Sequence, residues 1–148
     1  MSEHIDELII KYNIIHQTGE GGGEKFRVNC KPGYLCAPFF NTEIPQIYST
    51  ADIVVCRAGA GTISELTALE KKAVIIPLKI AQQNEQYFNA LEARKKIACV
   101  IIEEHNFTWN TLNEALENLL VIPSNKTKIS RQNPLDKITE ILINYLNI

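Results

Sequence analysis

One stretch of this chain combines small residues, the start of a helix and a carboxylate at a spacing that can hold an anion. Residues 52–65 have the sequence DIVVCRAGAGTISE, in which an apolar run passes through small residues into a helical pattern. Such a run is typical of a buried parallel strand, and glycines allow a ligand to approach the backbone closely. The N–H groups and the dipole of the following helix would attract an anion, above all a phosphate.

Two further features bear on this phosphate hypothesis. Glu65 lies one turn into the expected helix, where its carboxylate could accept hydrogen bonds from a sugar hydroxyl. The spacing is neither G-x-G-x-x-G nor that of a P-loop, which excludes the dinucleotide fingerprint and the Walker phosphate loop. A tight connection in which small residues only permit packing explains the pattern equally well, and spacing alone leaves both interpretations open.

A second polar group lies one strand further along the chain. Residues 82–89 have the sequence QQNEQYFN and open a helix, and their amide side chains could bind sugar hydroxyls. Composition alone favours an ordinary solvated helix start. However, both polar groups follow predicted strands, at 53–56 and 73–76, and ligands of open α/β sheets bind beyond the carboxyl ends of strands. If these two strands pair, the two groups share one crevice.

Other side chains could line this crevice without carrying chemistry of their own. His16 ends an earlier strand, although a lone histidine there more often has a structural role. Arg57 could bind phosphate or pair with Asp52 or Glu65, and the aromatic pair at 39–40 could pack in the core or on a base. We find no nucleophile with a base, no pair of carboxylates and no ligand spacing for a metal. We therefore predict no catalytic residue, no metal and no cofactor.

Alternating strands and helices are expected to position these residues. Strands are predicted at 13–16, 34–38, 53–56, 73–76 and 99–102. Helices are predicted at 3–11, 43–50, 61–71 and 83–96, from a cap at Thr108 or Asn110 to Leu120, and after a polar linker at 123–134. This alternation implies βαβ units, right-handed crossovers and a parallel sheet. The fold class is therefore α/β, in a single domain over residues 1–148.

Length and composition exclude several classes of protein. The 148 residues carry a net charge of −2 and are 45% hydrophobic, which is typical of a soluble globular domain and gives no basic field for nucleic acid. No apolar run approaches the length of a membrane span, and the acidic N-terminus is unlike a signal peptide. The four cysteines have no metal-ligand spacing, so buried thiols in a reducing cytoplasm are expected.

On these residues the chain resembles the C-terminal, donor-binding domain of the MurG family of glycosyltransferases. The resemblance rests on CRAGAGTISE at 56–65 and QYFNA at 86–90, with IHQTG at 15–19 and PFF at 38–40 upstream, and it covers residues 1–120. It implies a GT-B glycosyltransferase whose Rossmann-like domain binds UDP-GlcNAc. The implied reaction is inverting transfer of GlcNAc to lipid I in peptidoglycan synthesis, without a metal.

The resemblance also assigns substrate-binding roles to individual residues. Glu65 would hold the ribose, and the turn from Gly59 with the N–H groups of Ala60, Gly61 and Thr62 would hold the diphosphate. The GlcNAc hydroxyls would meet Glu85, Gln86 and Asn89, the uracil would lie beside Phe40 and Asn41, and His16 would line the same crevice. The family carries a bulkier residue where Gly61 stands.

Two parts of the family's pattern have no counterpart in these residues. One is the N-terminal domain, which faces the membrane and the lipid-linked acceptor. The other is the first strand of the C-terminal domain, which is central in the family's sheet. We therefore expect a marginally stable chain, a rearranged sheet or a partner that supplies the strand, and no transfer by the chain alone. Peripheral contact with the inner face of the plasma membrane is implied by the resemblance only.

Two other functions fit less closely. One is a non-catalytic UDP-sugar-binding subunit of a split glycosyltransferase. The other is a nucleotide-sugar epimerase of similar build, which would need carboxylates and histidines clustered at the crevice, and the sequence shows no such cluster.

Overall fold

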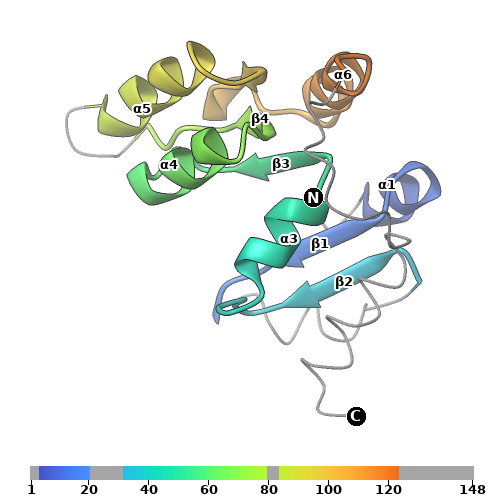
Figure 1. Ribbon diagram of the computed structural model, residues 1–148. Coiled ribbons are helices and arrows are strands. Elements are labelled where there is room, and N and C mark those ends of the chain that lie inside the picture. The colour runs from blue at the N-terminus through green and yellow to red at the C-terminus, as the bar shows by residue number, and fades with distance from the viewer. Residues whose placement is uncertain (1–3, 21–31, 80–83, 124–148) are drawn as a thin grey trace. The chain divides into compact units, whose positions relative to one another are not determined.

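The computed structural model describes residues 4–20, 32–79 and 84–123 of the chain (Figure 1). Its elements in chain order are α1 (Ile5–Lys11), β1 (Ile14–Gln17), β2 (Tyr34–Ala37), α3 (Ile44–Thr50), β3 (Ile53–Cys56), α4 (Ala60–Ala68), β4 (Lys72–Ile75), α5 (Glu85–Arg94), β5 (Cys99–Ile101), the 3-10 turn η4 (Glu104–Asn106) and α6 (Trp109–Leu120). They divide into two compact units, one with the described residues up to Thr50 and one with those from Ala51 onward.

The predicted order of strands and helices is confirmed across the described residues. Two helices end earlier than predicted, α4 at Ala68 and α5 at Arg94. Within the described ranges, no helix has the length and apolarity that a membrane crossing requires. The predicted linker and final helix lie outside the described residues, so the single domain over 1–148 stays a prediction.

The first unit is built on β2, whose four residues are all buried. β1 and β2 pair in parallel, from Ile14 opposite Tyr34 to Gln17 opposite Ala37. Side chains alternate between the two faces of a strand. One cluster accordingly contains Leu35 and Ala37 with Phe40 and Ile47, and the other contains Tyr34 and Cys36 with Ile5. The first unit therefore has apolar packing on both faces of its short sheet.

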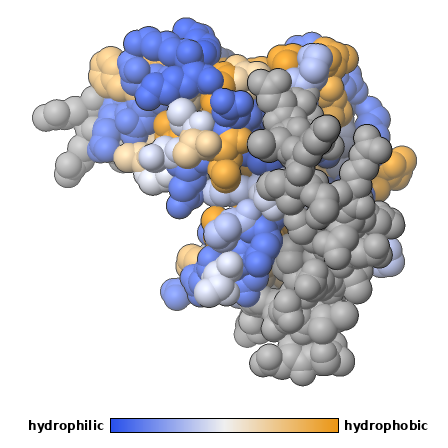
Figure 2. Space-filling view, in the orientation of Figure 1, coloured by the Kyte–Doolittle hydropathy of each residue, from blue (hydrophilic) through white to orange (hydrophobic). Residues whose placement is uncertain are grey.

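The second unit is a parallel sheet in the order β3-β4-β5. All four residues of the central strand β4 are buried, which requires cover on both of its faces. Helix α6 contacts all three strands, and α4 and α5 pack against each other. Hydrophilic residues, among them the ion pair of Glu92 and Lys95, cover much of the exposed side of α5 (Figure 2), although Phe88 on the same helix is 59% exposed.

The apolar residues of helix α6 are spaced so that they lie on one side of the helix, against the sheet. Its buried residues repeat at helical spacing; they are Leu112, Ala115, Leu116 and Leu119. A capping box between Thr108 and Thr111 begins the helix. Lys72, buried in β4, donates from Nζ to the carbonyl oxygens of Leu119 and Ile122, 2.9 Å away in each case. These bonds give a donor to carbonyl groups at the end of the helix, where the helix itself supplies none.

The parallel strands form two sheets in place of one, which corrects the prediction of a single sheet. Among the described strands, β1 pairs only with β2, and β3 pairs only with β4. No described strand joins β1 to β3, so each of these strands is an edge. Val55 of β3 is 38% exposed, although the sequence of β3 is apolar throughout. A marginally stable chain, a rearranged sheet and a partner that supplies the strand all stay predictions.

Candidate functional site

The first part of the site is the turn between β3 and α4, in the second unit. Ala58 is fully buried, whereas Ala60 and Gly61 are exposed. Gly59 is the N-cap of α4, and no side chain caps the helix. The first N–H groups of a helix have no partner within the helix. Those of α4, at residues 60–62, can therefore bind an anion at the positive end of the helix dipole.

The two glycines of the turn keep this helix start uncovered. No heavy atom lies within 4 Å of the place that a Cβ would occupy at Gly59 or at Gly61. Neither residue has a positive φ, so the backbone conformation does not require glycine. Their contribution is the open space in front of the amides.

We predict that Gly61→Ala stabilises the protein by about 0.5–1 kcal/mol, because alanine restricts the unfolded chain and favours a helix. Urea denaturation measures this change. Gly19→Ala is the matched control: Gly19 also has open space around it but has a φ of +73°, so alanine there should destabilise. Loss of stability in Gly61→Ala would contradict the open geometry of the turn.

The second part of the site is the start of α5, and the structure brings it to the turn. The predicted pairing of the two strands is confirmed, with Ile53 opposite Lys72 and Cys56 opposite Ile75. Asn89 on α5 donates from Nδ2 to the carbonyl oxygen of Ala58, at 3.1 Å. The two polar groups therefore lie together at the carboxyl edge of the sheet, as a shared crevice requires.

The side chains predicted to contact a sugar differ in how freely they can do so. Glu65 on α4 and Glu85 on α5 are exposed, so each carboxylate can accept hydrogen bonds from a ligand. Gln86 is half-buried and its Oε1 accepts a hydrogen bond from the N–H of Leu78, at 2.9 Å. This bond uses one of the two lone pairs of the carbonyl oxygen, so a ligand hydroxyl could be met by the amide nitrogen of Gln86 or by the second lone pair.

Arg57, at the start of the turn, has a partner that the sequence analysis missed. Its Nη2 lies 2.8 Å from Oε1 of Glu104, and its Nη1 donates to the carbonyl oxygen of Ile76 at 3.3 Å. The ion-pair partner of Arg57 is therefore Glu104, and not Asp52 or Glu65 as the sequence suggested. The available signal was position, because Glu104 follows β5 just as Arg57 follows β3, at the same edge of a parallel sheet.

His16 belongs to the first unit. Its Nδ1 lies 2.7 Å from the hydroxyl of Tyr34. Burial lowers the pKa of His16 below its ordinary value of 6.5, so the ring is uncharged at neutral pH. This contact supports the structural role, and a part for His16 in ligand binding stays a prediction.

Phe40 and Asn41 also belong to the first unit. Phe40 is 6% exposed and packs in the core, and its N–H donates to Oε1 of Gln17 at 3.0 Å. Its ring is therefore not available to stack on a base, whereas the neighbouring Phe39 is 46% exposed. Asn41 is exposed. A contact of this segment with uracil stays a prediction.

The thiols and the tryptophan are mostly interior, as expected. Cys36 is buried, Cys56 and Cys99 are half-buried, and Trp109 is half-buried at the start of α6. Burial raises the pKa of Cys56 to about 11, so this residue beside the turn is a thiol at neutral pH and not a nucleophilic thiolate. Cys30 lies outside the described residues.

Comparison with known proteins matches the chain to one family. The family described as "Glycosyltransferase family 28 C-terminal domain" matches residues 1–142. Among curated proteins, the chain is similar to the UDP-N-acetylglucosamine–N-acetylmuramyl-(pentapeptide) pyrophosphoryl-undecaprenol N-acetylglucosamine transferase of Clostridium tetani (strain Massachusetts / E88), with 34% identity over 97% of this chain and 41% of the relative. The protein of the same name from Vesicomyosocius okutanii is 32% identical over 97% of this chain and 44% of the relative.

A solved structure agrees with this match. The crystal structure of Acinetobacter baumannii MurG is similar with a TM-score of 0.64 and 25% sequence identity, over 89% of this chain and 43% of that chain. The chain thus spans less than half the length of the relatives that it matches. The fold class predicted from the sequence, a Rossmann-like domain of the GT-B type, is confirmed.

Proposed function

Because the chain belongs to glycosyltransferase family 28, whose C-terminal domain it matches over residues 1–142, we propose that it binds UDP-GlcNAc as a glycosyl donor. The names of its relatives describe transfer of N-acetylglucosamine to N-acetylmuramyl-(pentapeptide) pyrophosphoryl-undecaprenol. We propose that this chain provides the donor site for that reaction. Since the acceptor carries an undecaprenyl chain, the reaction would take place at a membrane surface, which the protein would meet from the cytoplasm.

The observation that supports this proposal most is the uncapped start of α4 beside the polar start of α5. The amides of Ala60, Gly61 and Thr62 would hold the diphosphate, and the exposed carboxylate of Glu65 would accept hydrogen bonds from the ribose hydroxyls. The Asn89 bond to Ala58 fixes the turn against α5. The amide nitrogen of Gln86 and the carboxylate of Glu85 would then reach the GlcNAc hydroxyls.

This arrangement would assist the departure of UDP. In an inverting transfer the acceptor hydroxyl forms a bond to the anomeric carbon and loses its proton. The bond between that carbon and the β-phosphate oxygen breaks, and UDP takes the electron pair. Negative charge therefore grows on the diphosphate in the transition state. Fixed N–H groups and a helix dipole stabilise such charge without having to reorganise.

Calorimetric titration of the full chain tests the donor proposal. We expect UDP and UDP-GlcNAc to bind saturably with one site per chain, and ADP to bind at least ten times more weakly. The comparison with ADP is needed because a helix start alone would bind any diphosphate. A folded sample that binds neither uridine nucleotide, or that binds ADP equally well, would overturn the proposal.

We predict that Asn89→Ala weakens UDP binding several-fold and lowers stability by about 1 kcal/mol, because the turn loses its bond to α5. Asn89→Asp should be worse, since its carboxylate would face the carbonyl oxygen of Ala58 without a donor. Titration with UDP and urea denaturation measure the two effects. An unchanged affinity in both variants would show that this bond does not hold the site.

A further inference from the structure

The outer edge of β5, in the second unit, presents backbone groups that no described strand takes up. The carbonyl oxygen of Ala98 accepts from Ala73, and the N–H of Ile102 donates to Ile75, so these groups point toward β4. Alternate residues of a strand point their backbone groups to opposite edges. Those of Cys99 and Ile101 therefore point outward. Such a row of donors and acceptors is a template for another strand.

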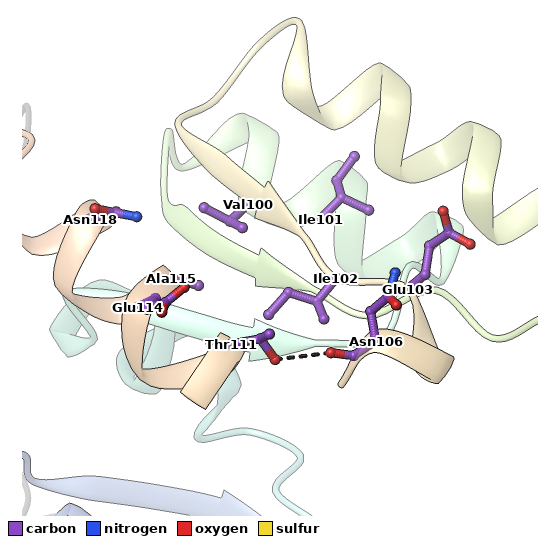
Figure 3. A pocket seen from close by; sticks show the side chains of 9 residues that line it. All are labelled: Val100, Ile101, Ile102, Glu103, Asn106, Thr111, Glu114, Ala115 and Asn118. Carbon is purple, nitrogen blue, oxygen red and sulfur yellow. Dashed lines mark hydrogen bonds between the residues drawn. The ribbon is translucent and has the colours of Figure 1, made fainter. Parts of the chain in front are cut away.

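A groove beside this edge gives the added strand a place for its side chains. A cavity of about 300 Å³ lies between β5 and α6 (Figure 3). Val100, Ile101 and Ile102 line it from the strand, and Thr111, Glu114, Ala115 and Asn118 line it from the helix. Ala115 lines the groove from the middle of α6, and its small side chain is only 3% exposed. An edge strand beside a helix is an arrangement that takes an extended peptide as one more strand.

The charges around the groove indicate what kind of peptide fits it. Glu103 and Glu114 are both exposed, and the nine residues that line the groove include no lysine or arginine. Oε2 of Glu103 lies 3.6 Å from Nδ1 of His105, which does not line the groove. Two copies of this chain that met at β5 would bring these carboxylates toward each other's acidic groove, which disfavours self-association. A basic segment would be attracted instead.

We propose that the groove between β5 and α6 binds an extended, basic segment of a partner protein. The segment adds to β5 as a further strand and bonds to the backbone of Cys99 and Ile101. Its small or β-branched side chains face Val100 and Ala115, and its lysine or arginine residues lie near Glu103 and Glu114. This interaction is separate from donor binding, because none of the residues that line the groove belongs to the turn or to the sugar-binding side chains.

Nuclear magnetic resonance of the full chain with synthetic peptides tests this proposal. The first peptide is a capped pentapeptide with lysine at both ends and valine, threonine and valine between them. The second has glutamate at both ends, and the third is the basic peptide with alternate amides N-methylated. We expect the basic peptide to shift the amide signals of Cys99 and Ile101 and to slow their hydrogen exchange. The other two peptides should bind at least ten times more weakly.

Two variants on the exposed side of α6 sharpen the test. Glu114→Lys, at the groove, should lower the affinity for the basic peptide at least five-fold. Glu117→Lys, at a position that does not line the groove, should leave that affinity unchanged. The proposal is overturned if the basic and acidic peptides bind equally, or if the shifts lie elsewhere. It is also overturned if the Ile101 amide is already protected without peptide, since the edge would then be covered by this chain or a second copy.

Discussion

Replacing Glu65 by alanine is expected to weaken UDP binding about ten- to a hundredfold, because the ribose hydroxyls lose a charged hydrogen-bond acceptor. Glu65 is exposed on the first turns of α4, so the substitution should leave the fold intact. Glu65→Gln should retain part of the affinity, since the amide oxygen still accepts a hydrogen bond. Calorimetric titration with UDP measures both variants, and binding of 2′-deoxy-UDP should differ little between them and the unmodified chain.

The control for this prediction is Glu92→Ala. Glu92 is an exposed carboxylate on α5 whose partner is Lys95, at 2.6 Å. Its loss changes the net charge by the same amount as Glu65→Ala, and the affinity for UDP should not change. If both substitutions weakened binding equally, the effect would be one of overall charge, and Glu65 would have no specific contact with the nucleotide.

Replacing Lys72 by alanine is expected to destabilise the protein by about 2–4 kcal/mol. Its Nζ donates to two carbonyl oxygens at the end of α6, where the helix dipole is negative. Alanine would leave a cavity under the helix and remove both bonds. Lys72→Met keeps most of the volume and should cost less than alanine, which separates the packing contribution from the hydrogen bonds. Urea denaturation measures the two changes.

Lys95→Met is the matched control for Lys72, because the side chain of Lys95 is 68% exposed and its one ion pair among the described residues is with the neighbouring Glu92. Its unfolding midpoint should not move. A small loss of stability in Lys72→Ala, equal to that of the control, would mean that the end of α6 does not depend on this buried cation.

The features that the sequence predicted are those set by local pattern. Apolar runs gave the strands at 53–56 and 73–76, and the carboxyl ends of parallel strands share an edge. This rule predicted that the polar groups after the two strands share a crevice, and the hydrogen bond from Asn89 to Ala58 joins them there. Small residues between a strand and a helix left two interpretations open, a phosphate site and a packing turn, and the uncovered positions at Gly59 and Gly61 are compatible with the first.

The features that the sequence did not predict depend on long-range packing. Glu104 is 47 residues from Arg57, and its place after β5, at the same edge of the sheet, is the one feature that points to it. Phe39 and Phe40 have the same side chain, and only the packing of Phe40 against Leu35 and Ala37 of β2 and Ile47 of α3 shows that it is the buried one. Lys72 had no assigned role, because a lysine at the start of a strand is ordinarily solvated.

The amide signals of Ala60, Gly61 and Thr62, followed during titration of the labelled full chain with UDP, test the central claim most directly. The account predicts that these three amides shift saturably, with the same dissociation constant as calorimetry, and that uridine without phosphates fails to move them. If UDP bound the folded chain and left these amides unchanged, the diphosphate would lie elsewhere and the assignment of the site to the start of α4 would be wrong.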